Sequence, residues 1–429
     1  MPIQASLVVL FAFFALGVPV YAAFFGFNIV AAIGLMGPQM LSIFSASILD
    51  TVTTSELVTV PLFILLGELL FRSGSITILF DAVDTLVGRV RGRQYVIVVI
   101  ISVLLGALSG SAIAVAAMLG RTVMTEGIAR GGDRKLLAGL VLGGACLAPI
   151  IPPSFLVVLI GMLSGTSISA LLAAGVLPGV VAGVLFFAYV QVLLWRDPSR
   201  DLERAPQGRN TPAWKAALSL LPFSIVIFAV LGLILLGIAT PNESAACGVL
   251  GALAVAAIYR KLSLAMIIES LRGSILMAAM ILIIMAGSKI LTQLMAFSNL
   301  TGDLVQLLTS VDLPAAAVLV LLMLIPFVLC MFLDQIALML ILIPIYTPLL
   351  ATFGYDPLVF WTLFLLNLTL GAITPPFGYA LFALNGAAPR ALTLRDTYAA
   401  AWPFIGLILL TMLLIWVFPG LATWLPSLL

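Results

Sequence analysis

The sequence APIIPPSF at residues 148–155 interrupts one long apolar segment, and the related sequence AITPPF at residues 372–377 interrupts another. Two consecutive prolines remove two backbone donors, and each proline disfavours helical geometry in the residue before it. A helix with such a pair in its middle is expected to break into two half-helices, with unbonded carbonyl groups between them. We predict broken helices over residues 136–164 and 357–388.

The composition requires that most of the surface faces something other than water. Of the 429 residues, 63% are hydrophobic and 8% are charged, whereas soluble domains carry about a quarter of their residues as charged side chains. A spanning helix needs about 20 apolar residues, and the apolar blocks supply about ten such segments. We therefore predict an all-α polytopic membrane protein. Its first 49 residues carry no charge, which favours a retained N-terminal span over a signal peptide with a basic start.

The residue types that are missing narrow the possible functions. Histidine is absent and the three cysteines are scattered singly, which disfavours histidine-assisted catalysis and transition-metal sites. No GxxxxGK[ST] phosphate-binding loop is present, so we do not expect the chain to use ATP by itself. We expect a transporter driven by an ion gradient, with no enzymatic activity and no cofactor. A remote alternative is an intramembrane hydrolase that uses Ser109 or Ser111, for which Lys289 is the partner in question, although no spacing argument links them.

Most lysines and arginines gather in clusters, which the positive-inside rule places in the cytoplasm. These clusters fall at residues 89–93, 130–135, 196–215, 260–272 and 390–395. The apolar stretch 94–129 has a cluster at each end and the small-residue sequence GALSGS in its middle. This predicts a re-entrant hairpin that enters from the cytoplasm, with its tip buried in protein. The stretch 314–350 lacks flanking cations and contains Asp334, which predicts a second hairpin that enters from outside.

The two halves of the chain share an internal repeat. Ser111 precedes Pro152 by the same number of positions by which Asp334 precedes Pro375. Each half contains five crossings, so the second copy must be inverted, and inverted repeats place a binding site near the membrane midplane. Each repeat comprises three spans, a connector, a hairpin, a broken helix and a closing span. The predicted organisation is a first repeat at residues 1–195 (hairpin 94–129, broken helix 136–164), a cytoplasmic linker at 196–215, and a second repeat at 216–429 (hairpin 314–350, broken helix 357–388).

The breaks and the hairpin tips are the predicted site of a coupling cation. Unwound carbonyls beside half-helix ends suit Na⁺, and the tips add hydroxyl groups and one carboxylate. Asp334 has two open roles, as a cation ligand or as the N-cap of the helix that follows it. The predicted cation-binding residues are Ser109, Gly110, Ser111, Leu147, Pro149, Ile150, Asp334, Gly371, Ala372 and Thr374.

Polar residues near the breaks are candidates for substrate binding. These candidates are Ser154, Asn367, Pro376 and Asn385. For the two asparagines the alternative is a hydrogen bond between helices. Lys289 lies in the middle of the apolar stretch 273–298, where a charge is costly. We expect it either to form a structural ion pair with Glu68, the nearly equivalent residue of the first repeat, or to contact substrate.

These motifs resemble the large membrane subunit of the tripartite ATP-independent periplasmic (TRAP) transporters, the family of the dicarboxylate and sialic-acid permeases. The resemblance runs along nearly the whole chain. It is strongest in VPLFILLGE (60–68), LSGS (108–111), IPPS (151–154), AGVLPG (174–179) and GAITPP (371–376). The sequence RTVM at residues 121–124 departs from the family, where a less basic stretch with a proline is expected.

The resemblance implies an elevator carrier, in which two hairpins and two broken helices move substrate and Na⁺ past a static scaffold in a bacterial inner membrane. It implies two partners, a small four-helix membrane subunit and a periplasmic substrate-binding protein, and we expect neither to be fused to this chain. It also implies that the substrate is a small organic acid with a carboxylate. The alternative within the same architecture is a stand-alone divalent-anion:Na⁺ symporter or dicarboxylate carrier.

Overall fold

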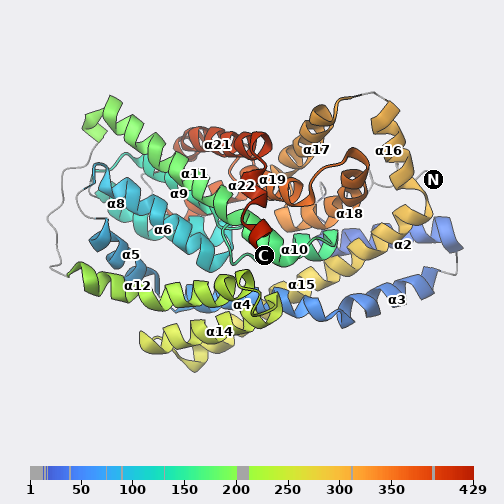
Figure 1. The fold of residues 1–429 in the computed structure, drawn as a ribbon, viewed down its shortest axis with the longest axis horizontal. Helices are drawn as coiled ribbons and strands as arrows, with labels where there is room; N and C mark the ends of the chain where they lie inside the picture. Colours follow the sequence, from blue (N-terminus) through green and yellow to red (C-terminus); the bar gives the residue numbers. More distant parts are fainter. Residues whose placement is uncertain are drawn as a thin grey trace.

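The computed structural model describes residues 13, 16, 18–37, 40–73, 75–87, 90–129, 131–200, 212–310, 313–388 and 392–429. Within these ranges every regular element is a helix. The helices form two layers, a long lower layer and a more compact upper layer (Figure 1). The C-terminus lies near the centre of this view.

The lower layer is built around one very long helix. It contains α15 (Leu264–Phe297), α2 (Val20–Met36), α3 (Met40–Thr53), α4 (Thr59–Arg72), α12 (Ala213–Ile227) and α14 (Pro241–Ile258). Helix α15 contacts α2, α3 and α4, while α14 packs on α4 and on α12. Short elements complete the layer: η2 (Ser55–Val58), the π-turn η5 (Phe228–Gly232) and α13 (Leu233–Leu235).

The upper layer contains two pairs of helices joined at a sharp break and two helices broken at Pro-Pro. The pairs are α6 (Arg93–Ser109) with α7 (Ala112–Leu119), and α17 (Ala315–Cys330) with α18 (Gln335–Phe353). The broken helices are α9 (Arg134–Leu147) with α10 (Phe155–Ser164), and α19 (Pro357–Gly371) with α20 (Tyr379–Ala387). The remaining elements are the π-turn η3 (Gly120–Met124), α8 (Thr125–Ala129), α11 (Ile168–Arg196), η4 (Pro198–Arg200), α21 (Leu394–Val417), α22 (Gly420–Thr423) and η6 (Pro426–Leu428).

Two short helices connect the lower layer to the upper layer along the chain. Helix α5 (Ser75–Leu86) follows α4 and contacts both α6 and α12, and α16 (Leu300–Ser310) follows α15 and contacts α18. Each lies in sequence between a helix of the lower layer and the first helix of a pair in the upper layer. The sequence at residues 121–124 that departs from the family forms most of the π-turn η3, which continues directly from α7.

The two halves of the chain pack in the same way in the upper layer. Helix α6 packs on α9 and α17 packs on α19, so each pair places its first helix against the broken helix that follows it in sequence. Helix α7 packs on α20 and α18 packs on α10, so each second helix contacts the broken helix of the other half. The two halves are therefore interlocked.

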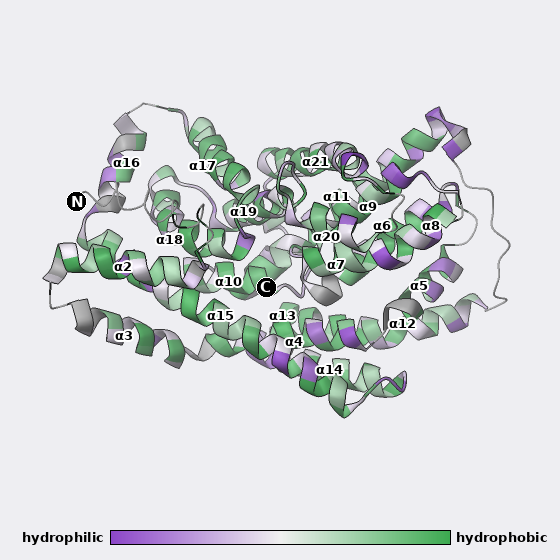
Figure 2. Cartoon of the chain, turned by 180° about the vertical axis from the view of Figure 1, so that it is seen from behind, coloured by the Kyte–Doolittle hydropathy of each residue, from purple (hydrophilic) through white to green (hydrophobic). Residues whose placement is uncertain are grey.

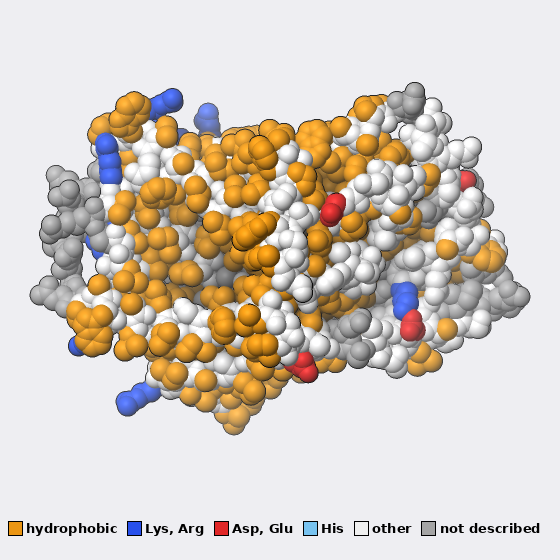
Figure 3. Space-filling model, in the orientation of Figure 1, with side chains coloured by type: hydrophobic (Ala, Val, Ile, Leu, Met, Phe, Trp, Pro, Cys, Tyr) orange, Lys and Arg blue, Asp and Glu red, His pale blue; other side chains and the backbone are white. Residues whose placement is uncertain are grey.

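The surface and the helix lengths agree with a membrane protein. Hydrophobic residues run along most helices, while hydrophilic residues concentrate near α5, α8 and other helix ends (Figure 2). Hydrophobic side chains also cover much of the face seen in Figure 3. Among the described residues, seven helices are long and apolar enough to span a bilayer. Part of the predicted retained N-terminal span lies outside the described residues, because most of residues 1–17 are not described.

The expected Lys289–Glu68 ion pair is wrong. Lys289 pairs with Asp50 of α3, and Glu68 pairs with Arg72 at 2.8 Å. Helix α15 has 34 residues, which span about 51 Å at 1.5 Å per residue, and Lys289 lies in its last third rather than at its centre. A tilted helix of this length places Lys289 nearer a membrane boundary, where α3 supplies a carboxylate. Lys289 therefore belongs to the lower layer, away from the serines of the α6–α7 break.

Candidate functional site

Four half-helices begin at the tips and breaks of the upper layer. They are α7, α10, α18 and α20, and each follows an interruption of the chain rather than a surface loop. Ser111, Ser154 and Asp334 cap the first three of these helices with side-chain oxygens. Gly378 begins α20 without a side-chain cap. Because helix N-termini carry partial positive charge and unbonded N–H groups, this arrangement favours anions near the half-helix starts.

The first tip lies against the first break. Gly110 has a φ of +60°, a left-handed conformation that glycine adopts without strain. A Cβ on Gly110 would lie 3.6 Å from the Phe155 ring and 3.7 Å from the Pro153 carbonyl oxygen. Deeper along the same helix, a Cβ on Gly106 would meet the Ala148 Cα at 2.8 Å. Small residues therefore allow α6 to approach the broken helix at backbone distance.

The first break has unbonded carbonyl groups. Leu147 accepts hydrogen bonds from the Ile150 and Ile151 amides at 3.1 and 3.0 Å. Across the described residues, the carbonyls from Ala148 to Pro153 accept no hydrogen bond. One of them faces away from the tip, because a Cβ on Gly175 of α11 would lie 2.4 Å from the Ile150 oxygen. The predicted pool of free carbonyls is present here, but Leu147 is satisfied and Ile150 points toward α11.

The second tip also lies against its own break. Gly371 packs on Cys330 so closely that a Cβ would meet the Cys330 Cβ at 2.3 Å. The rings of Phe332 and Phe377 lie 5.5 Å apart. Asp334 accepts hydrogen bonds from the Ile336 and Ala337 amides at 2.9 and 3.3 Å. The capping role foreseen for Asp334 is therefore confirmed, while the role in cation binding stays a prediction.

The second break differs from the expectation, because most of its predicted free carbonyls are bonded. Leu370 accepts from the Ile373 amide and the Thr374 hydroxyl, and Gly371 accepts from the Thr374 amide at 3.2 Å. Ala372 accepts from the Ala380 amide at 3.1 Å. The Ala380 amide can reach the Ala372 carbonyl because Gly378 has no side chain. A Cβ on Gly378 would lie 2.6 Å from the Ala372 oxygen. The free-carbonyl prediction is thus wrong for Leu370, Gly371 and Ala372, and for Thr374, which accepts from Gly378.

The two broken helices meet where their first halves end. The Cys146 thiol donates to the Thr369 carbonyl at 3.1 Å, in a fully buried contact. Nearby, the Tyr379 hydroxyl of α20 is buried and has no hydrogen-bond partner among the described residues. Tyr379 is the first residue of α20 and directly follows Gly378 at the end of the second break. Tyr379 therefore places an unused donor at the start of the half-helix that follows the second break.

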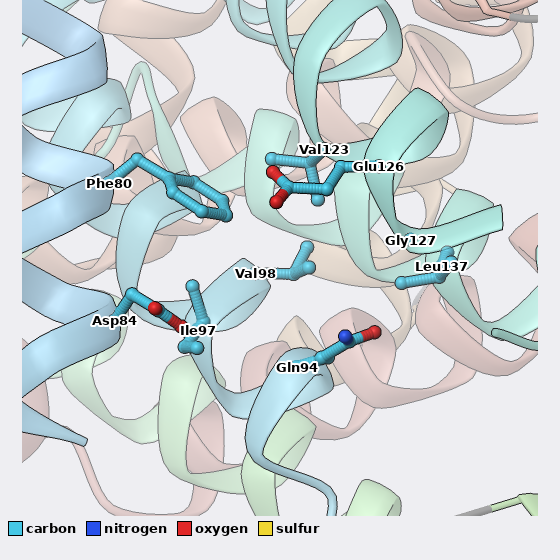
Figure 4. Close-up of a pocket in the computed structure, with 9 residues that line it drawn as sticks. All are labelled: Phe80, Asp84, Gln94, Ile97, Val98, Val123, Glu126, Gly127 and Leu137. Carbon is cyan, nitrogen blue, oxygen red and sulfur yellow. The ribbon is translucent and has the colours of Figure 1, made fainter. Parts of the chain in front are cut away.

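A small cavity elsewhere in the upper layer cannot hold an organic solute. It lies between α5, α6, α8 and α9, and its volume of about 20 Å³ is enough for about one water molecule. Asp84, Gln94 and Glu126 point toward it (Figure 4). Asp84 also pairs with Arg93 at 3.2 Å. The cavity is best understood as a polar contact between the α5 connector and the helices that follow it.

The comparison with protein families agrees with this architecture. Residues 7–421 match the family described as tripartite ATP-independent periplasmic transporter, DctM component. The chain belongs to this family. As a TRAP large permease it is a multi-pass protein of the bacterial inner membrane, and its family consists of transport permeases rather than enzymes. The family resemblance read from the motifs is thereby confirmed.

Characterised relatives cover most of this TRAP permease. The ectoine/5-hydroxyectoine TRAP transporter large permease protein of Ruegeria pomeroyi is 28% identical, with 87% of this chain and 86% of that protein covered. The sialic acid TRAP transporter large permease protein of Vibrio cholerae is 30% identical, with 87% and 86% covered. The solved YdaH transporter of Alcanivorax borkumensis is 14% identical, covers 90% of each chain and has a TM-score of 0.64, which shows a similar fold.

The TRAP permease structure brings some of the predicted site residues together and keeps others apart. Ser111, Ser154, Gly110 and Asp334 lie at the tips and half-helix starts, whereas the side chain of Ser109 lies outside the described residues. Pro149 is buried within the first break, and Pro376 forms the cis bond of the second, where its carbonyl accepts from Tyr398 at 2.7 Å.

The two asparagines make hydrogen bonds between helices. The Asn367 amide donates to the Met323 carbonyl of α17, and the Asn385 oxygen accepts from Thr397 of α21 at 3.4 Å. Asn385 also lies more than one turn beyond the start of α20. The alternative foreseen for these residues, a structural hydrogen bond, describes both.

Tyr379 and Pro153 were missed in the sequence. At the offset that aligns Pro152 with Pro375, Tyr379 matches Leu156 of the first repeat. The sequence could have indicated Tyr379, because one repeat has a polar residue where the other repeat has an apolar one. Pro153 gave no such signal, because the direction of its carbonyl depends on how the tip packs.

Proposed function

We propose that this TRAP permease imports a small organic acid with a carboxylate, coupled to Na⁺ and working as an elevator with re-entrant hairpins at α6–α7 and α17–α18. A small four-helix membrane subunit and a periplasmic binding protein are its proposed partners. The observation that carries the proposal is the set of half-helix starts and free carbonyls at the tips and breaks, where Asp334 is the one charged side chain. Such a set offers ligands to a small hard cation and partial positive charge to an anion.

The cation part of the proposal assigns different ligands to the two halves. In the first half, free carbonyls of the break, including Pro153 beside Gly110, and the Ser111 hydroxyl would supply neutral oxygens. In the second half most carbonyls are bonded, so the Asp334 carboxylate and the Thr374 hydroxyl would carry more of the interaction. Oxygen ligands of both kinds suit Na⁺.

The substrate part rests on charge. No lysine or arginine occurs in the tips or breaks, at residues 109–111, 147–154, 331–334 and 371–378. A carboxylate bound there would be held by half-helix N-termini and by the bound cation rather than by a cationic side chain. The named substrates of the relatives above, ectoine and sialic acid, support a small polar solute but do not select one.

Uptake by proteoliposomes that contain the permease and its two partners tests this function. We expect an inward Na⁺ gradient to drive accumulation of an organic acid, and we expect accumulation without ATP on either side. Scanning sialic acid, ectoine and C4-dicarboxylates identifies the substrate. Equal uptake with Na⁺ absent from both sides would refute the Na⁺ coupling and leave the family assignment intact.

Tyr379→Phe is expected to weaken substrate or cation binding without destabilising the protein. The buried hydroxyl has no partner within the described residues, so its removal relieves an unsatisfied group instead of breaking a bond. We expect the apparent KM for substrate or Na⁺ to rise about fivefold, the effect of losing one hydrogen bond of about 1 kcal/mol. Initial uptake rates at varied concentrations give this value.

Tyr346→Phe is the matched control. The Tyr346 hydroxyl is also buried, but it donates to the Leu322 carbonyl at 2.9 Å between α18 and α17. Its removal should lower the thermal stability of the purified permease and leave the KM unchanged. If Tyr379→Phe instead behaves as this control does, the Tyr379 hydroxyl is structural.

A further inference from the structure

An open groove runs along the outer side of the lower layer between α12 and α14. It has a volume of about 540 Å³. Leu218, Leu221 and Ile225 line it from α12, and their side chains are about half exposed. Gly251 and Ala254 line it from α14. Pro222 breaks the regular hydrogen bonding of α12 at the level of the groove, and the small residues keep α14 from filling the space.

One end of the groove is polar, aromatic and basic. Lys215 and Tyr259 line this end, and Tyr259 donates from its hydroxyl to the Ser219 carbonyl at 2.6 Å, which ties the two helices together. The Tyr259 ring also stacks on Phe223 with centroids 5.7 Å apart. Arg260 and Lys261 follow directly in sequence, and both are exposed. Figure 3 shows lysine and arginine side chains at this end of the lower layer.

The basic end has no acidic counterpart within the described residues. Lys215, Arg260 and Lys261 form no ion pair there, and Lys215 instead lies over the Trp214 ring at 5.4 Å. The first amides of α12 also lack a side-chain cap, so the helix adds partial positive charge. Tryptophan and tyrosine beside lysine are typical of the level of lipid headgroups. The positive-inside rule places this end at the cytoplasmic leaflet.

We propose that this groove binds an anionic phospholipid of the cytoplasmic leaflet. The acyl chain lies along Leu218, Leu221 and Ile225, and the phosphate headgroup lies between Lys215 and Lys261. Apolar walls alone would accept any lipid, so the selectivity for negative charge comes from the basic end. A juxtamembrane lysine contributes about 1 kcal/mol to the binding of anionic lipid, which is about a fivefold change in affinity. The proposal is independent of the transported substrate.

Native mass spectrometry of the full-length permease in detergent tests it, with phosphatidylglycerol and zwitterionic phosphatidylcholine as the added lipids. The parent protein should retain phosphatidylglycerol more tightly than phosphatidylcholine. The double variant Lys215→Gln/Lys261→Gln should lose about 25-fold in phosphatidylglycerol affinity, with phosphatidylcholine binding unchanged. Arg196→Gln, an exposed cation at the end of α11 outside the groove, is the control and should bind both lipids like the parent.

A second pair of variants tests the groove itself. Ala254→Phe should fill the α14 side of the groove and weaken binding of both lipids. Leu250→Phe, on a highly exposed position of the same helix that does not line the groove, should not. Equal retention of the two lipids by the parent protein overturns the proposal. Occupation of the groove by the small membrane subunit also overturns it. That outcome would appear as disulfide crosslinks between Ala254→Cys, in a Cys247→Ser background, and a cysteine introduced into that subunit, with a yield that phosphatidylglycerol does not lower.

Discussion

Asp334→Asn is expected to raise the Na⁺ concentration for half-maximal uptake by about tenfold or more, whereas Ser111→Ala should raise it less. Both residues cap the second helix of their pair, Asp334 at α18 and Ser111 at α7. They differ in charge. A carboxylate within about 4 Å of Na⁺ contributes on the order of 4 kcal/mol at an effective dielectric constant of 20, and part of that is lost to desolvation. A remaining 1.4 kcal/mol is about tenfold in affinity.

The Asp334→Asn substitution separates charge from capping. Asparagine is about as good an N-cap as aspartate, so the start of α18 should persist and the amount of protein in the membrane should stay the same. The second break makes this carboxylate important, because its carbonyls are largely bonded to nearby amides. Initial uptake rates titrated against Na⁺ decide the matter. An Asp334→Asn permease with the parent's half-saturation would mean that the carboxylate only caps the helix.

Gly175→Ala is expected to abolish uptake and to destabilise the protein. The added Cβ would lie 2.4 Å from the Ile150 carbonyl oxygen, and neither atom belongs to a flexible side chain. Either α11 or the first break must therefore move. Overpacking of this kind costs about 1–3 kcal/mol, and here the displaced group is the unwound segment that faces the first tip.

Gly183→Ala on the same helix is the control. Its Cβ would meet only the Val103 Cγ2, at an ordinary 3.9 Å, and alanine favours a helix over glycine by about 1 kcal/mol. We expect unchanged or slightly higher thermal stability and normal uptake. Melting of the purified variants, followed by loss of the monodisperse chromatographic peak, measures the difference. A Gly175→Ala permease that melts and transports like Gly183→Ala would show that the contact between α11 and the first break is loose.

Much of the fold could be predicted because it depends on local chemistry. The Pro-Pro pairs lie just beyond the ends of α9 at Leu147 and α19 at Gly371, because two consecutive prolines remove two helix donors. Single prolines do not interrupt α11, α17 or α18. The small residues at 109–111 and Asp334 likewise mark the turns between paired helices. The inverted arrangement of the two repeats in the membrane stays a prediction, although both halves present corresponding helices in the same order.

The hydrogen bonds of the breaks and the pairing of Lys289 could not be predicted, because they depend on contacts between segments far apart in the sequence. Whether a carbonyl in a break is free depends on whether an amide from the following helix donates to it. The Ala380 amide donates to the Ala372 carbonyl, while the first break has no corresponding hydrogen bond. Lys289 was assigned to Glu68 by counting along the repeat, but the side chain is paired by α3, whose angle to α15 the sequence does not specify. The Cys146 thiol reaches the Thr369 carbonyl only when the broken helices of the two halves cross.

Because helices of one half pack on helices of the other, parts of the fold can form only late during synthesis of the chain. Helix α7 packs on α20, which begins only at Tyr379 near the end of the chain, whereas α6 finds α9 almost at once. Because synthesis is slow, α7 waits on the order of ten to fifty seconds for its partner. During that interval its contact face must be shielded by lipid, by the insertion machinery or by temporary neighbours. A nascent chain stopped before residue 379 would therefore hold α7 only against α6 and α9 of its own half, and the ribosome must finish nearly the whole message before α7 can pack on α20.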